Sequence, residues 1–169
     1  HTAVMQHELL TLIRRYADAN ADRFGIAHTH VPGLSMVRAT IPGELQHAIN
    51  RPLVAMVVQG ETHVIMGHDR LSFPAGQSML ISTDVPTVSQ ITKATAGEPY
   101  YSLVLELDQG IVEDLTREMH GGAADVVKPL RIDPTEAEVA EAAIRLLRLF
   151  DRPTAMRVLQ DQLMREFHF

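Results

Sequence analysis

The amino-acid sequence predicts an α+β domain, in which a small antiparallel β-barrel lies between an N-terminal helix and C-terminal helices. Two observations support this fold class. Between residues 53 and 82, short apolar runs rich in β-branched residues are separated by glycine turns, and no helical period interrupts them. Apolar residues at helical spacing occur only before and after the extended region. A meander of this kind closes most economically into a barrel whose mouth can hold one ligand.

Length and composition fit one domain of an ordinary soluble protein. A chain of 169 residues can build one full hydrophobic core, and 46% apolar with 21% charged residues is typical of a globular domain. No apolar run approaches the roughly 20 residues that a membrane helix needs. The absence of cysteine excludes disulfides and thiolate metal sites. Because the start of the sequence also lacks an export signal, we expect a cytoplasmic protein.

The net charge of -6 argues against nucleic-acid binding by this chain. DNA attracts proteins through clustered Lys and Arg, and Arg14-Arg15 is the only adjacent basic pair. Such a pair on a helix surface is usually a solvated face.

The first expected helix covers residues 4–19, where apolar residues from Val4 to Tyr16 recur at helical spacing. Strands are expected at residues 33–40, 44–49, 53–58, 62–66, 79–81, 88–93 and 100–107. In the last strand Tyr101, Leu103 and Leu105 share one face, which we expect to be buried.

Helical periodicity returns after Asp108. A short stripe covers residues 111–119, Asp133-Pro134-Thr135-Glu136 predicts a helix start with Asp133 as N-cap, and a last helix begins near Thr154. We therefore expect residues 1–108 to form the helix and barrel, and residues 109–169 to form a helical segment packed on it within the same domain. The apolar stripes of the C-terminal helices need a cover, which is either the barrel or a second subunit.

No catalytic group stands out. His28 and His30 lie on one side of an extended segment, but they lack a nearby carboxylate and a third histidine. His47 and His63 could meet across neighbouring strands and His68 lies in a turn, yet structural histidines explain all of these better. Neither a Gly-x-Ser-x-Gly elbow nor a phosphate-binding glycine loop occurs. We expect no catalytic residue, no metal site and no cofactor.

Several segments together resemble one family of regulators. They are residues 31–34 (VPGL), 51–60 (RPLVAMVVQG), 71–77 (LSFPAGQ), 80–88 (LISTDVPTV), 99–108 (PYYSLVLELD) and 146–151 (LLRLFD). Together they resemble the N-terminal domain of AraC/XylS-type transcriptional regulators. The resemblance implies a cupin-like jelly roll with appended helices, followed by two helix-turn-helix units. The cupin metal pattern is not met, since residues 46–48 read Gln-His-Ala and residues 84–88 contain no histidine. This departure favours a ligand-sensing cupin over a metalloenzyme.

The implied function is control of transcription through a small-molecule effector, self-association or both. DNA would be contacted only through a DNA-binding half that lies beyond Phe169, no membrane is expected as a partner, and a homodimer would form through the C-terminal helices. Strand parity and the need for a few polar groups in an apolar cavity suggest five ligand-binding residues. They are His47, Met56, His63, Gln90 and Tyr101. Two alternatives stay open: a metal-dependent cupin enzyme that uses His28, His30 or His47, and a purely structural dimerisation module.

Overall fold

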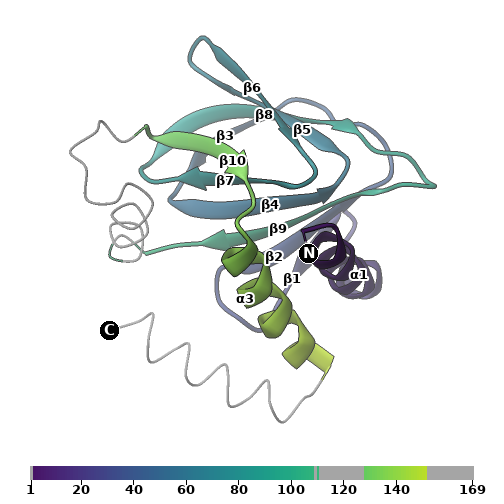
Figure 1. Cartoon of the computed structure of the whole chain (residues 1–169). Coiled ribbons are helices and arrows are strands. Elements are labelled where there is room, and N and C mark those ends of the chain that lie inside the picture. The colour runs from purple at the N-terminus through teal and green to yellow at the C-terminus, as the bar shows by residue number, and fades with distance from the viewer. Residues whose placement is uncertain (1, 109, 111–127, 152–169) are drawn as a thin grey trace.

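The computed structural model describes residues 2–108, 110 and 128–151. It contains two antiparallel sheets, with one helix packed on one of the sheets and a second helix packed against the first (Figure 1). The elements are α1 (Thr2–Asn20), β1 (Ile26–His28), β2 (Leu34–Ala39), β3 (Gln46–Asn50), β4 (Leu53–Gln59), β5 (Glu61–Met66), β6 (Asp69–Pro74), β7 (Gln77–Ile81), β8 (Val85–Lys93), β9 (Tyr100–Glu106), β10 (Leu130–Pro134), α3 (Ala137–Arg148) and the 3-10 turn η1 (Leu149–Asp151). The predicted order of helix, extended region and helix is therefore confirmed. The helices predicted at residues 111–119 and from about 154 lie outside the described residues.

The strands form two separate sheets. Six of them lie in the order β1-β2-β9-β4-β7-β10 and four in the order β3-β8-β5-β6, and every pairing is antiparallel. The prediction of one closed barrel is wrong for the described residues, because no strand in them is hydrogen-bonded to both sheets. The fold is a two-layer sandwich that keeps two edge strands in each sheet.

The glycine turns explain why the sheets stay separate. Of the glycine turns between residues 53 and 82, only the one at Gly67, between β5 and β6, makes the hairpin expected of a meander. At Gly60 the chain passes from β4 in the larger sheet to β5 in the smaller one, and near Gly76 it returns to β7. Gly60 has a φ of 86°, and a Cβ there would collide with the Lys93 carbonyl oxygen. Glycine is therefore required at this crossing by both its conformation and its close approach.

Apolar side chains form two layers of core, because the six-stranded sheet is covered on both faces. In β4, Ala55 and Val57 pack in the layer between the sheets, whereas Met56 and Val58 pack in the layer beneath the helices. A strand with two covered faces reads as a continuous apolar run rather than as an alternating one. The run from Leu53 to Val58 has this composition.

Both helices bury their apolar stripes in the same layer, where α1 packs on the larger sheet and α3 packs on α1. Leu9 and Ile13 of α1 are fully buried, and Ile144 and Leu147 of α3 pack in the same layer. Of the two covers considered for the C-terminal stripes, the stripe of α3 is thus covered by its own chain. No helix in the described parts of the chain is long and apolar enough to cross a membrane.

The start of α3 differs from the prediction. Asp133 and Pro134 end strand β10, which pairs with β7, and the N-cap is Glu136 without a side-chain cap hydrogen bond. Pro134 lies at the end of an edge strand, where its missing N–H donor is tolerated. The Asp-Pro pair therefore ends a strand that the sequence pattern did not indicate, and Asp133 does not act as the predicted N-cap.

Candidate functional site

Four hydroxyl side chains face the layer between the two sheets. Tyr100 and Ser102 come from β9 in the larger sheet, and Thr62 and Thr87 come from β5 and β8 in the smaller one. Each is at most 8% exposed. Alternation along the strands explains their direction, since Ser102 lies opposite Val37 and Val57, two side chains of this layer. We call these four residues the inner hydroxyl cluster.

The inner hydroxyl cluster is incompletely hydrogen-bonded. Burial raises the pKa of the Tyr100 phenol above its ordinary value, while the nearby Ser102 and Thr62 hydroxyls lower that pKa in part. Thr62 Oγ1 is nevertheless buried without a partner at acceptable distance and angle in the described parts of the chain. The Thr62 hydroxyl therefore lies near the phenol but completes no well-aligned bond. A buried hydroxyl left in this state costs about 1–3 kcal/mol.

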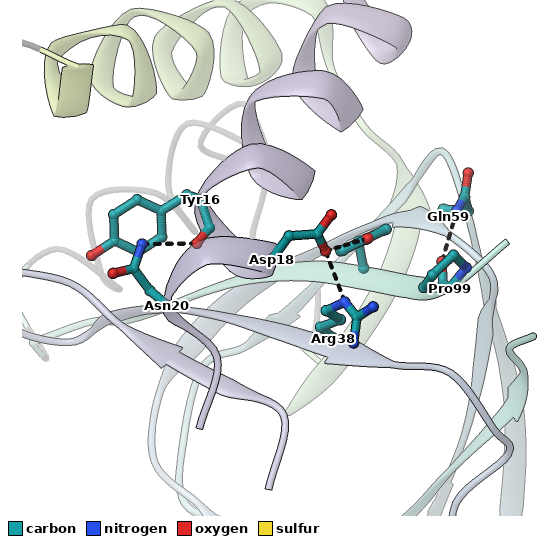
Figure 2. A network of polar contacts seen from close by, with 7 residues as sticks. Tyr16, Asp18, Asn20, Arg38, Gln59 and Pro99 are labelled. Atoms are coloured by element: carbon teal, nitrogen blue, oxygen red, sulfur yellow. Dashed lines mark hydrogen bonds and ion pairs between the residues drawn. The ribbon is translucent and has the colours of Figure 1, made fainter. Parts of the chain in front are cut away.

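A second polar group joins α1 to the outer face of the larger sheet. Figure 2 shows Asp18 pointing from the last turns of α1 towards Arg38 of β2. Arg38 Nε donates to Asp18 Oδ1 at 2.7 Å, and the Tyr101 hydroxyl donates to the same oxygen at 2.6 Å. Burial raises the pKa of Tyr101, and its bond to Asp18 raises that pKa further. A carboxylate near a helix C-terminus interacts unfavourably with the helix dipole, and the positive charge of Arg38 offsets this interaction for Asp18.

A groove of about 220 Å³ runs between α1 and α3. It is lined by Leu12, Arg15, Tyr16, Ala19, Asn20, Leu147 and Phe150. The Tyr16 and Phe150 rings lie 5.2 Å apart and are tilted, and the Tyr16 hydroxyl donates to the His28 carbonyl at 3.0 Å. Asn20 Nδ2 donates to the Tyr16 carbonyl, as Figure 2 shows. An aromatic pair from α1 and η1 thus lines this groove.

The five predicted ligand-binding residues do not converge on one cavity. Met56 and Tyr101 pack in the layer beneath the helices. His63 lies opposite Gln90 on the outer face of the smaller sheet, and His47 is exposed at its edge. His63 Nε2 is 2.9 Å from Glu61 Oε2, and Gln90 Nε2 donates to the Gly43 carbonyl at 3.0 Å. Alternation along the strands directs none of the five side chains into the layer between the sheets. Their role as ligand contacts remains a prediction.

The histidines stay apart. His47 and His63 could have met on neighbouring strands, but β8 lies between their strands β3 and β5. In the described residues, no group of three or more His, Asp or Glu side chains is arranged to hold a metal ion. The site of a metal-dependent cupin is therefore not formed by His28, His30 and His47 in this part of the chain.

Sequence reasoning missed the inner hydroxyl cluster, two of whose members lie on the other face of β9. Tyr101 was assigned to the buried face, which is correct, but Tyr100 and Ser102 on the opposite face are buried as well. The bulges near Gln59 and Glu61 also shift the register on either side of Gly60. The available signal was the presence of hydroxyl residues in β5, β8 and β9. These residues can be assigned to a buried layer only once both faces of the larger sheet are known to be covered.

Comparison with known proteins identifies the family. Residues 30–169 match the family model for the AraC-type transcriptional regulator N-terminus. The chain belongs to this family. The resemblance found in the sequence is thereby confirmed, as is the predicted role of an AraC-type regulatory domain. A search of curated proteins found no match.

Solved structures that match this chain include ToxT and a cupin-2 domain protein. ToxT from Vibrio cholerae O395, bound to (E)-4-(8-methylnaphthalen-1-yl)but-3-enoic acid, is 10% identical, with 79% of this chain and 57% of ToxT aligned and a TM-score of 0.51. Another ToxT structure from Vibrio cholerae is 9% identical over 79% of this chain and 56% of ToxT, with a TM-score of 0.49. A cupin-2 domain protein from Shewanella frigidimarina NCIMB 400 is 15% identical over 43% of this chain and 67% of its own, with a TM-score of 0.33. This AraC-type chain thus spans just over half the length of ToxT.

Proposed function

We propose that this AraC-type domain senses a small effector that is held between the two sheets and hydrogen-bonded to the inner hydroxyl cluster. The observation that carries the proposal is the buried, unpartnered Thr62 Oγ1 beside Tyr100. Buried hydroxyls in native proteins almost always have a partner, so an unsatisfied one calls for a missing group. A ligand that supplies this partner removes a penalty which the free domain carries.

The side chains of this layer favour a neutral effector with an apolar body. Its apolar members are aliphatic and aromatic, including Val57, Val64 and Phe73. Among the described residues, the buried polar side chains are Thr62, Thr87 and Ser102, and none of these is charged. An ionised carboxylate would lie there without compensation, which is far less favourable than a hydroxyl or carbonyl group. The acid bound to ToxT suggests a size of probe to test, and we propose that an uncharged counterpart binds this chain better.

The whole regulator would couple this site to DNA. We propose that a DNA-binding half lies outside this chain, and that the protein acts in the cytoplasm, where transcription takes place. The effector changes DNA binding only if it binds one arrangement of the regulator better than the other. Since α3 packs on α1, and α1 packs on β4 and β9, a change between the sheets can reach α3 through these strands and α1.

The first test uses matched probes. Binding of 1-naphthalenemethanol and of 1-naphthoic acid to the purified chain is measured by calorimetry and by thermal shift. We expect the alcohol to bind and stabilise the domain, and the acid to bind at least about tenfold more weakly at neutral pH, because its charge would be buried. Equal binding of the two, or tighter binding of the acid, would contradict a neutral effector site.

The second test removes the unpartnered group. Thr62→Val should stabilise the free domain by about 1–3 kcal/mol, because an unsatisfied hydroxyl is replaced by a methyl group, and it should weaken binding of the alcohol. Thr92→Val is the matched control, since the Thr92 hydroxyl already donates to the Glu61 carbonyl at 3.4 Å. This control should destabilise the domain slightly and leave binding unchanged. A destabilised Thr62→Val domain would support a purely structural module, and stoichiometric metal in the purified chain would support an enzyme.

A further inference from the structure

The chain crosses from β4 to β5 beside Tyr100 of the inner hydroxyl cluster. Strand β4 contains a bulge just before Gln59, its last residue. Gln59 lies opposite Tyr101, and the pairing of β4 with β9 ends with these two residues. Pro99 and Tyr100 therefore lie beyond the end of this ladder, and strand pairing with β4 does not hold them.

The side chain of Gln59 takes the place of the missing ladder contact. Its Nε2 donates to the Pro99 carbonyl at 2.8 Å, across 40 positions of the sequence, as Figure 2 shows. Pro99 is buried, and a buried carbonyl without a partner is unfavourable. The Pro99 carbonyl belongs to the same planar peptide unit as the Tyr100 nitrogen and Cα. A hydrogen bond to this oxygen thus fixes the plane from which the Tyr100 side chain projects.

The next residue, Gly60, packs directly against Tyr100. A Cβ at Gly60 would lie 3.1 Å from Tyr100 Cδ2 and 3.2 Å from Tyr100 Cα. Glycine therefore allows the tyrosine to approach the backbone this closely. Two consecutive residues, Gln59 and Gly60, thus contact the Pro99-Tyr100 segment, and the phenol at the far end of Tyr100 lies near the Thr62 hydroxyl.

We infer that Gln59 is a positioning residue for the effector site, because its bond to Pro99 holds Tyr100 beside Thr62 before the effector arrives. The inference rests on the proposed function, since Tyr100 affects binding only if the effector lies between the sheets. A side chain that is held in advance loses little further freedom when a ligand binds, so binding is tighter. Gln59 acts through Tyr100 and does not itself contact the effector.

The first readout is the ring signal of Tyr100 in NMR spectra of the free chain with isotope-labelled tyrosine. The sequence contains three tyrosines, so single tyrosine-to-phenylalanine variants assign all of their signals. Gln59→Met keeps the length of the side chain and removes its N–H donors. We expect it to shift or broaden the Tyr100 signal and to leave the Tyr16 signal unchanged. Gln59→Glu, which is closer in shape and also lacks the donors, should have the same effect at neutral pH.

The second readout is binding of 1-naphthalenemethanol, measured by calorimetry. Gln59→Met should weaken this binding about three- to tenfold, which corresponds to the cost of ordering one side chain that is no longer held in advance. Asn20→Leu is the matched control, because Asn20 Nδ2 donates to the Tyr16 carbonyl at 2.9 Å. The control also loses one amide–carbonyl hydrogen bond, and it should leave both the Tyr100 signal and the binding unchanged.

The outcomes separate this inference from the proposed function. An unchanged Tyr100 signal in Gln59→Met would overturn the inference, even if the parent chain binds the alcohol as the proposed function requires. Equal weakening of binding by Gln59→Met and Asn20→Leu would show a merely structural role and would overturn it as well. A parent chain that does not bind the alcohol would overturn the proposed function and with it the role of Gln59 in binding, whereas the Tyr100 signal would still report whether Gln59 positions the tyrosine.

Discussion

The two core layers of this domain are built from different chemistry. The layer beneath the helices, which includes Leu9, Ile13 and Met36, is apolar, and its polar contacts lie at its rim, where Asp18 holds Arg38 and Tyr101. The layer between the sheets contains four buried hydroxyls, one of which has no hydrogen-bond partner among the described residues. An apolar layer without unpaired polar groups stabilises the fold. A layer with an unpaired hydroxyl can be stabilised further by a ligand that hydrogen-bonds to it. The comparison separates the structural core from the proposed sensing core.

The largest effect is expected in the layer beneath the helices. Ile13 is fully buried there, so Ile13→Ala should lower the free energy of unfolding by about 2–5 kcal/mol through lost contacts and a cavity. Urea unfolding followed by circular dichroism measures the change. Val4 lies on the same helix and is 70% exposed, so Val4→Ala should change the free energy by less than about 0.5 kcal/mol. Equal effects of the two substitutions would show that α1 does not pack as described.

An intermediate effect should distinguish the two adjacent tyrosines. Tyr101→Phe removes a hydrogen bond to a carboxylate at 2.6 Å, and it should destabilise the domain by about 1–2 kcal/mol. Tyr100→Phe removes only contacts to neutral hydroxyls, and it should cost about 1 kcal/mol or less.

The measurement for the tyrosine pair is again the free energy of unfolding, now combined with binding of 1-naphthalenemethanol. Under the proposed function, only Tyr100→Phe should weaken that binding. A loss of binding in Tyr101→Phe alone would place the effector beneath the helices and reverse the comparison.

The smallest effect is a loss of stability at alkaline pH. The pKa of both Tyr100 and Tyr101 is raised above the ordinary value of 10.0, chiefly by burial. Above pH 10 the unfolded chain therefore loses tyrosine protons that the folded chain retains, so the folded state binds more protons and stability falls as pH rises. Below pH 10 these two groups should contribute no pH dependence.

Unfolding free energies between pH 8 and pH 11 test the alkaline prediction. The decrease above pH 10 should be smaller in Tyr100→Phe and in Tyr101→Phe than in the parent chain. An unchanged decrease in both variants would show that neither tyrosine causes it.

Much of the fold could be predicted from the sequence, because periodicity and turn residues are local signals. The helical stripe through Leu9 and Ile13 and the apolar run from Leu53 to Val58 gave elements that the structure confirms. The family resemblance rested on such segments and was also correct. Strand partners were not predictable in the same way. Nothing near Gly60 distinguishes a hairpin turn from a crossing between sheets, since both require a positive φ.

The candidate site depended on these non-local features. Assigning Tyr101 to the buried face was correct, yet the direction of that face depends on where α1 packs, which strand parity does not reveal. Thr62 could not be found from sequence, because a missing hydrogen bond is a property of three-dimensional geometry. Pro134 was misassigned for a related reason, since the same Asp-Pro pair can begin a helix or end an edge strand.

The crossings between sheets also have a consequence for how the domain folds. Among the described strands, only β1–β2 and β5–β6 are consecutive strands that pair with each other. Every other pairing joins segments that are distant in the sequence, so loop-closure entropy must be lost before most of the sheet becomes stable. Domains dominated by such pairings fold in milliseconds to seconds rather than microseconds. We therefore expect a slow folder in which the β5–β6 hairpin at Gly67 forms early, and in which the six-stranded sheet assembles only after the chain has collapsed.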